Sequence, residues 1–145
     1  DSGSIKNKNN SLRGKLMDKG IRIVLVLMGL LALLAGLGFI FAPVQMEAEF
    51  SIVASRVDGL GTIRGDLGGM FLMAAGFIIY GSRPGKTLWL VVPMVLLVTV
   101  LFGRTVHIIV DGISQPAIRS TLVEIFALLF LNYARRRLPA GSSQE

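Results

Sequence analysis

Four apolar stretches, separated by polar residues or proline, constrain the fold of this chain more than any other feature. A helix needs about 20 residues to cross the hydrocarbon core of a bilayer. A segment inside the bilayer must satisfy its own backbone hydrogen bonds, and long runs without alternating polarity do so as helices. The sequence therefore predicts four membrane-spanning helices, at residues 21–42, 62–80, 87–110 and 117–133.

The composition agrees with one membrane domain. Of the 145 residues, 52% are hydrophobic and 17% are charged, and cysteine is absent. The lack of cysteine excludes disulfides, thiolate metal sites and cysteine nucleophiles. The net charge of +6 comes mainly from residues outside the apolar stretches, which fits membrane topology better than binding of nucleic acid. We expect an all-α, four-helix transmembrane bundle at 21–137 without a nucleic-acid partner.

The ends of the chain are polar. Residues 1–20 predict a flexible basic tail, and residues 138–145 predict a C-terminal tail. Met17 is a candidate for the natural start, with residues 1–16 as added sequence. A signal peptide is the alternative interpretation, but the apolar run after Met17 is longer than the about 7 to 15 residues typical of one. We therefore expect a retained span.

Positive charges outside the spans collect on one side of the membrane. They lie before the first span, in the loop 81–86 and after the fourth span, whereas acidic residues collect in the other loops. Loops rich in Lys and Arg stay in the cytoplasm, so both termini are expected there. Tyr80, Trp89 and Tyr133 fall at the same predicted end, where aromatic rings lie at headgroup level. The expected location is the bacterial inner membrane.

A short amphipathic helix is expected between the first two spans. Most charged residues of this segment fall between its apolar residues. The apolar residues recur three or four positions apart and are Met46, Phe50, Val53, Val57 and Leu60. The segment is too short and too charged to span, so it is expected to lie on the outer surface. An irregular loop with chance periodicity is the alternative.

Six ionisable residues lie toward the predicted outer ends of spans two to four: Arg64, Asp66, Arg104, His107, Asp111 and Glu124. A charge at mid-span costs about 2.5 to 3.5 kcal/mol, so such groups need partners or a polar cavity. At the helical rise of ~1.5 Å per residue, Arg104 and Glu124 reach similar depths in antiparallel neighbours. The spacing predicts an ion pair between them, with Arg64 facing Asp111 or Glu124.

Two interpretations of this polar cluster stay open. In the structural one, paired charges fix the helix register. In the functional one, Glu124 and His107 exchange protons while arginines hold an anionic or carbonyl-bearing headgroup. A metal is not predicted, because one histidine without a Glu-x-x-His spacing is a poor ligand set. No nucleotide-binding or nucleophile motif is present, so no catalytic residue is assigned and a non-enzymatic function is favoured.

The segment GTIRGDLGG, residues 61–69, contains four glycines at the start of the second span. At helical spacing, three of them share one stripe and the fourth lies beside it: Gly61, Gly65, Gly69 and Gly68. A phosphate loop needs an exposed turn, whereas the apolar run that follows indicates a helix entering the membrane. We expect a glycine seam that packs closely against another helix.

Three features also carry a resemblance: RGDLGGMFLMAAG in the second span, GRTVHIIVDG at the end of the third, and Glu124 in the fourth. Over roughly residues 21–137 the chain resembles small bacterial four-helix membrane proteins catalogued only as a domain of unknown function. The resemblance implies the architecture but no reaction. Asp66 departs from the family pattern, which has a neutral or aromatic residue nearby. The pattern positions are Arg64, Gly68, Gly69, Arg104, Asp111, Gly112 and Glu124.

The favoured function is binding of a lipid-like ligand, or service as an accessory subunit of a membrane complex, through the outer polar cluster. One alternative is an enzyme or redox accessory acting on a quinone or another lipophilic substrate. Proton-coupled transport is a second alternative, although, apart from Arg22 at the edge of the first span, no span carries a charge in its cytoplasmic half. No cofactor is predicted, but a bound lipid or quinone fits. The expected partners are membrane lipids, other membrane subunits or a second copy.

Overall fold

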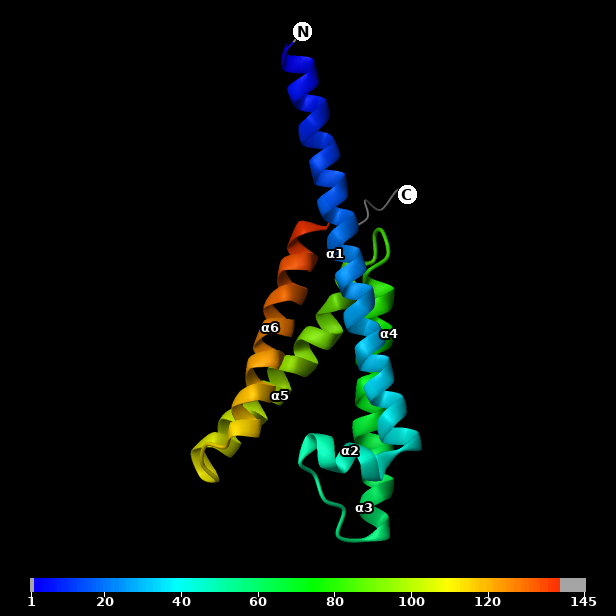
Figure 1. Cartoon of the computed structure of the whole chain (residues 1–145), viewed down its shortest axis with the longest axis vertical. Helices are drawn as coiled ribbons and strands as arrows, with labels where there is room; N and C mark the ends of the chain where they lie inside the picture. Colours follow the sequence, from blue (N-terminus) through cyan, green and yellow to red (C-terminus); the bar gives the residue numbers. More distant parts are fainter. Residues whose placement is uncertain (1, 139–145) are drawn as a thin grey trace.

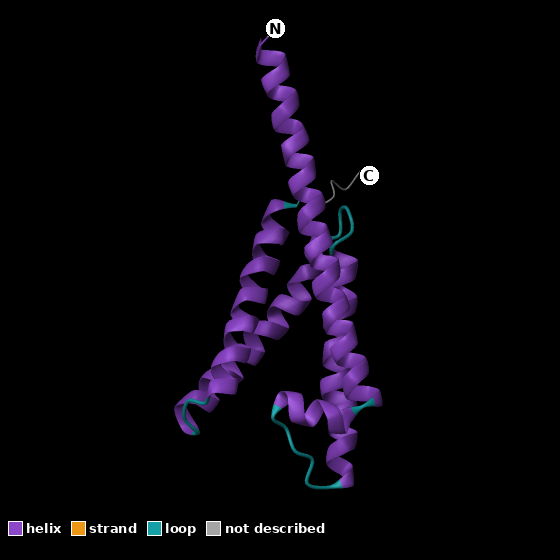
Figure 2. Cartoon of the chain, viewed as in Figure 1, coloured by secondary structure: helices purple, strands orange, loops and turns teal. Residues whose placement is uncertain are grey.

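The computed structural model describes residues 2–138, with side chains from residue 11 onward, and within this range it contains helices and loops but no strand (Figures 1 and 2). The predicted all-α fold is therefore confirmed. The elements in chain order are α1 (Ser2–Phe41), α2 (Pro43–Phe50), α3 (Val57–Thr62), the π-helix η1 (Ile63–Gly68), α4 (Gly69–Gly81), the 3-10 helix η2 (Thr87–Leu90), α5 (Val91–Val110) and α6 (Gln115–Arg137).

Four helical segments are long and apolar enough to cross a membrane: Ser11–Phe41, Val57–Gly81, Thr87–Val110 and Gln115–Arg137. Each contains one predicted span or nearly all of it. The second is continuous through α3, η1 and α4, and the third joins η2 to α5. Four such segments indicate an integral membrane protein.

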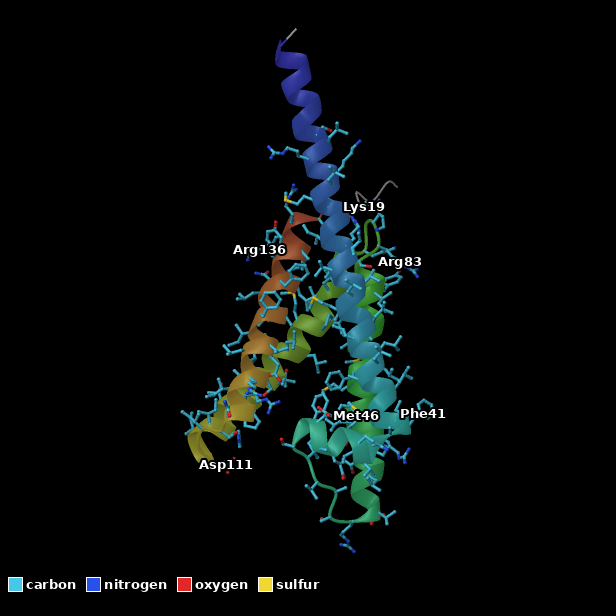
Figure 3. All side chains as sticks on the ribbon, in the orientation of Figure 1. Lys19, Phe41, Met46, Arg83, Asp111 and Arg136 are labelled. Carbon is cyan, nitrogen blue, oxygen red and sulfur yellow. The ribbon has the colours of Figure 1, made fainter. Side chains whose placement is uncertain are left out.

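The helices form two antiparallel pairs, α1 with α4 and α5 with α6, which meet at one end and diverge toward the other (Figure 1). Lys19, Arg83 and Arg136 lie toward the end where the pairs meet, which we call the basic end (Figure 3). Asp111 and Met46 lie toward the other end, which we call the far end. Loop 81–86 and the end of α6 thus share one side with the start of the first span.

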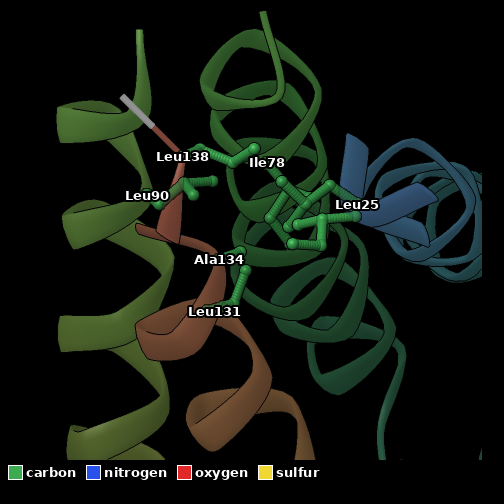
Figure 4. Packing of buried hydrophobic residues seen from close by; sticks show 7 residues of the cluster. Leu25, Ile78, Leu90, Leu131, Ala134 and Leu138 are labelled. Carbon is green, nitrogen blue, oxygen red and sulfur yellow. The ribbon is translucent and has the colours of Figure 1, made fainter. Parts of the chain in front are cut away.

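The buried core lies at the basic end, where residues of all four long helical segments pack together (Figure 4). Lipid tails are as apolar as leucine, so close packing, rather than removal of apolar surface from water, holds such helices together. Leu25, Leu90 and Leu131 have no exposed surface. The full cluster consists of Ile21, Leu25, Ile78, Leu90, Leu131, Ala134 and Leu138.

Small residues let α1 and α4 approach closely. A Cβ atom built on Gly29 would lie 2.5 Å from Ile79 Cγ1, and one on Gly36 would lie 2.8 Å from Leu72 Cδ2. The contacts continue beyond α4 into η1, where a Cβ on Gly68 would lie 2.7 Å from Ile40 Cγ1. The two helices therefore pack in antiparallel register along most of the second span.

The predicted glycine seam is correct only for Gly68. A Cβ atom on Gly61, Gly65 or Gly69 would meet no other atom within 4 Å, and all three residues are exposed. Gly68 packs on Ile40, and α1 ends at Phe41, so Gly61 and Gly65 lie beyond the end of the helix that they were expected to contact. Gly69 begins α4 and lies about 100° around the helix from Gly68, which shares its face with Leu72 and Ile79.

The predicted amphipathic helix is shorter than expected. α2 ends at Phe50, where Ser51 adopts a left-handed conformation (φ 55°). Within α2, Met46 packs against Gly38 and the Phe50 ring lies 4.8 Å from that of Phe39. Val53 and Val57, in contrast, are each 83% exposed. The expectation of one amphipathic helix through Leu60 is therefore wrong beyond α2.

A loop anchored by Glu47 replaces the second half of that expected helix. Its Oε1 atom accepts a hydrogen bond from the backbone N–H of Ala54 at 2.8 Å, and its carbonyl accepts one from Ile52 at 2.9 Å. The chain thus reaches α3 as a loop that is fixed to the end of α2.

The ends of the chain also differ from the expected tails. α1 begins at Ser2, so the helix runs through the segment predicted to be a flexible tail. Extending an existing helix adds one hydrogen bond for each residue fixed, which is far less costly than starting one. At the other end, Leu138 belongs to the core. The rest of the predicted C-terminal tail, 139–145, lies outside the described residues.

Candidate functional site

The predicted ion pair between α5 and α6 is present. Arg104 donates from Nε and Nη2 to the same carboxylate oxygen, Glu124 Oε1, at 3.4 and 3.3 Å. Charge-assisted bonds of this type are usually about 2.7 to 2.9 Å long, so the pair is loose. The Glu124 side chain is 16% exposed and that of Arg104 is 35% exposed. The carboxylate is therefore held inside the helix pair, while the guanidinium reaches its surface.

The hydrogen bonding of this pair is incomplete. Glu124 Oε2 and Thr121 Oγ1 are buried, and neither has a hydrogen-bond partner among the described residues. Thr121 and Glu124 lie three positions apart on α6, so they share a face. The hydroxyls of Thr99, Thr105 and Ser120 all donate to carbonyls of their own helices instead. The Thr121 hydroxyl makes no such bond, and it lies one helical turn from Glu124, whose carboxylate has only one of its two oxygens paired.

His107 on α5 and Asp111, the residue that caps the end of α5, form a second pair. His107 Nδ1 lies 2.8 Å from Asp111 Oδ2, and the two side chains are 42% and 60% exposed. The spacing along α5 places both on the face of Arg104, as the sequence predicts. This pair is nearer the far end and more exposed than the pair of Arg104 and Glu124. The α5/α6 pair thus carries four of the six ionisable residues of the predicted cluster.

The predicted position of Arg64 is wrong. Its guanidinium donates from Nη1 to the carbonyl oxygen of Ile40, at the end of α1. The last carbonyls of a helix lack partners within the helix, and the negative end of the helix dipole attracts a cation. Arg64 therefore caps α1 and does not face Asp111 or Glu124. Arg64 lies four positions before Gly68, which packs on Ile40, so it belongs to the α1/α4 pair and not to the α5/α6 pair.

Asp66 also lies apart from the cluster. It is exposed on η1 and forms no ion pair with any side chain between residues 11 and 138. The candidate site therefore reduces to the α5/α6 pair and gains Thr121, which the sequence analysis missed. The signal for Thr121 was its spacing of one helical turn from Glu124.

Comparison with models of protein families, with curated proteins and with solved structures gives no match to this chain. The resemblance to four-helix membrane proteins of unknown function stays a prediction.

Proposed function

We propose that this protein binds a lipid-like ligand in the outer leaflet, and that Arg104 and Glu124 hold the polar group of that ligand. The observation that carries the proposal is the buried, unpaired Oε2 atom of Glu124. A buried polar atom without a hydrogen bond costs about 1 to 3 kcal/mol, and inside a bilayer no bulk water can satisfy it.

The free groups of the site define the chemistry of the ligand. Glu124 Oε2 accepts a hydrogen bond, so it suits a hydroxyl or an N–H donor. Arg104 uses Nε and Nη2 toward Glu124, which leaves N–H groups for a phosphate, carboxylate or carbonyl oxygen. Thr121 Oγ1 supplies one further donor and acceptor. A lipid headgroup that carries both a hydroxyl and an acidic or carbonyl oxygen matches this set.

Arg104 provides the route of entry. Glu124 Oε2 and Thr121 Oγ1 are enclosed, whereas about a third of the Arg104 side chain is exposed (35%). The bonds from Arg104 to Glu124 are long, so a ligand oxygen can attract the guanidinium outward and open the carboxylate to its own donor. The ligand then completes a pair that the protein alone leaves half satisfied.

Native mass spectrometry of the protein purified in mild detergent tests this proposal. We expect the native chain to retain a lipid-sized adduct and Glu124→Gln to retain it at least about tenfold less, because bonds to a charged group contribute ~1.5 to 3 kcal/mol. Glu49→Gln is the matched control, because Glu49 is an exposed carboxylate on α2. Thermal unfolding of each variant is measured in parallel.

The outcomes separate the alternatives. Loss of stability in Glu124→Gln with the adduct retained would show that the pair only fixes the helix register. Absence of any adduct from the native chain would contradict ligand binding. A retained quinone would favour the alternative of a redox accessory, whereas a co-purifying polypeptide would favour the accessory-subunit alternative.

A further inference from the structure

An apolar groove lies on the α4 surface near the basic end, apart from the site between α5 and α6. Its volume is about 540 Å³, it is open to the surroundings, and almost all of its exposed lining is apolar. Gly76 leaves the helix surface uncovered between larger neighbours, since no atom lies within 4 Å of a Cβ built there. The lining residues are Leu72, Met73, Gly76, Phe77, Tyr80 and Trp89.

Aromatic rings line the end of the groove nearest the loop 81–86, and two cations of that loop lie beside them. The Trp89 ring stacks on Phe77 at 5.6 Å and meets the edge of Tyr80 at 5.8 Å. Arg83 Cζ lies 5.5 Å and Lys86 Nζ 5.9 Å from the centre of the Tyr80 ring. Both positive charges therefore lie beside a ring that lines the groove.

The loop that carries these cations is held by its backbone. Arg83 N–H donates to the Tyr80 carbonyl, and Lys86 N–H donates to the Arg83 carbonyl, each at 3.2 Å. Gly85 provides the positive φ of 75° that the turn requires, and the Arg22 guanidinium of α1 donates to the Ser82 carbonyl. The cations thus have fixed attachment points at the mouth of the groove.

We infer that this groove binds an anionic glycerophospholipid, with one acyl chain along Leu72 to Tyr80 and the phosphate between Arg83 and Lys86. Eight helical steps separate Leu72 from Tyr80, about 12 Å, which is less than half of the ~30 Å hydrocarbon core. The groove therefore serves one leaflet. Tyr80 and Trp89 lie at its charged end, where amphipathic rings meet lipid headgroups.

The charges select this occupant. The lining and the two rim residues include two cations and no carboxylate, so an anionic headgroup is complementary to them. A zwitterionic headgroup adds a positive charge beside Arg83 and Lys86. A second copy seated through the same face brings two such cationic rims together. Both of these alternatives are electrostatically less favourable.

Trp89 gives a direct readout, because it is the only tryptophan in the chain and it lines the groove. Quenching of its fluorescence is measured in nanodiscs that contain increasing fractions of brominated phosphatidylglycerol or brominated phosphatidylcholine. We expect the anionic lipid to reach half-maximal quenching at a fraction about 30-fold lower, since two basic residues near an anionic headgroup contribute ~1 kcal/mol each. Equal curves for the two lipids would overturn the proposal.

Gly76→Leu tests the groove, because the added side chain has open space in the fold and fills the cavity. We expect this variant to lose the preference for the anionic lipid. Gly69→Leu is the matched control: Gly69 lies two turns away on the same helix, also with an open Cβ position, and it does not line the groove. Loss of the preference in both variants, or in neither, would contradict the site.

The charge contribution is tested by the double variant Arg83→Gln, Lys86→Gln. Its control is Arg135→Gln, Arg136→Gln, which removes the same charge from exposed positions of the basic end outside the groove. We expect only the first double variant to lose the preference. An equal loss in both would show general attraction of anionic lipid to the basic end. If neither lipid quenches Trp89 and cross-linking yields a dimer, a second copy of the chain occupies the groove and the proposal is overturned.

Discussion

The guanidinium of Arg64 lies on the carbonyl oxygen of Ile40, so an arginine of the second span closes the end of the first. We expect Arg64→Met to lower the free energy of unfolding by about 1 kcal/mol, because the last carbonyls of α1 lose a cationic partner. Denaturant unfolding in detergent measures the change, and retention of the lipid-sized adduct should be unaffected. Loss of the adduct at unchanged stability would instead show that Arg64 takes part in binding the ligand.

Gly68 and Gly69 are adjacent in sequence but differ in their surroundings. We expect Gly68→Ala to destabilise the protein by about 1 to 3 kcal/mol, because the new methyl group presses on Ile40 and lies 3.3 Å from the Gly36 carbonyl oxygen. Gly69→Ala meets open space, so it should be neutral or raise stability by up to ~1 kcal/mol through helix propensity. Thermal unfolding of both variants tests the register of η1. Equal effects would show that this register is wrong.

Thr121→Val removes the hydroxyl that lacks a partner beside Glu124. In delipidated detergent we expect the unfolding free energy to stay unchanged or to rise by about 1 kcal/mol, since an unpaired buried oxygen is lost. Retention of the adduct should fall at the same time. Thr99→Val is the control, because its hydroxyl donates to the Val95 carbonyl. A clear loss of stability in Thr121→Val alone would show that the hydroxyl has a structural partner.

The orientation in the membrane is open to a labelling experiment, because the sequence contains no cysteine. Single cysteines at Pro84 and Gln115 occupy exposed positions at the two ends of the bundle. We expect a membrane-impermeant maleimide to label Gln115→Cys in intact cells and Pro84→Cys only after lysis. The reverse pattern would place the Arg104 and Glu124 pair in the inner leaflet. Labelling of both from one side would contradict the four spans.

The four spans and the ion pair between Arg104 and Glu124 could be predicted, because the first follow from the lengths of the apolar runs and the second from the helical rise per residue. An apolar run of sufficient length specifies a spanning helix. Depth along two consecutive helices then follows from the rise per residue, which is why Arg104 and Glu124 were paired correctly. Consecutive helices joined by a short turn leave little freedom in their relative depth.

Arg64 and the glycine seam could not be predicted in the same way. Their surroundings depend on where α1 ends and on which face of the second span packs against it, and neither follows from the sequence of the second span alone. The end of α2 is a similar case, since the three-and-four spacing continues past Phe50 into a loop where Val53 is exposed. A periodic pattern shows what a helix would bury, but the backbone can depart from the helix before the pattern ends.

The position of the core has a consequence for biogenesis. Three of its seven side chains, Leu131, Ala134 and Leu138, come from the last stretch of the described chain to leave the ribosome. The glycine contacts between α1 and α4 require only residues synthesised earlier. The first helix pair can therefore assemble during translation, whereas the basic end closes only after synthesis has passed Leu138.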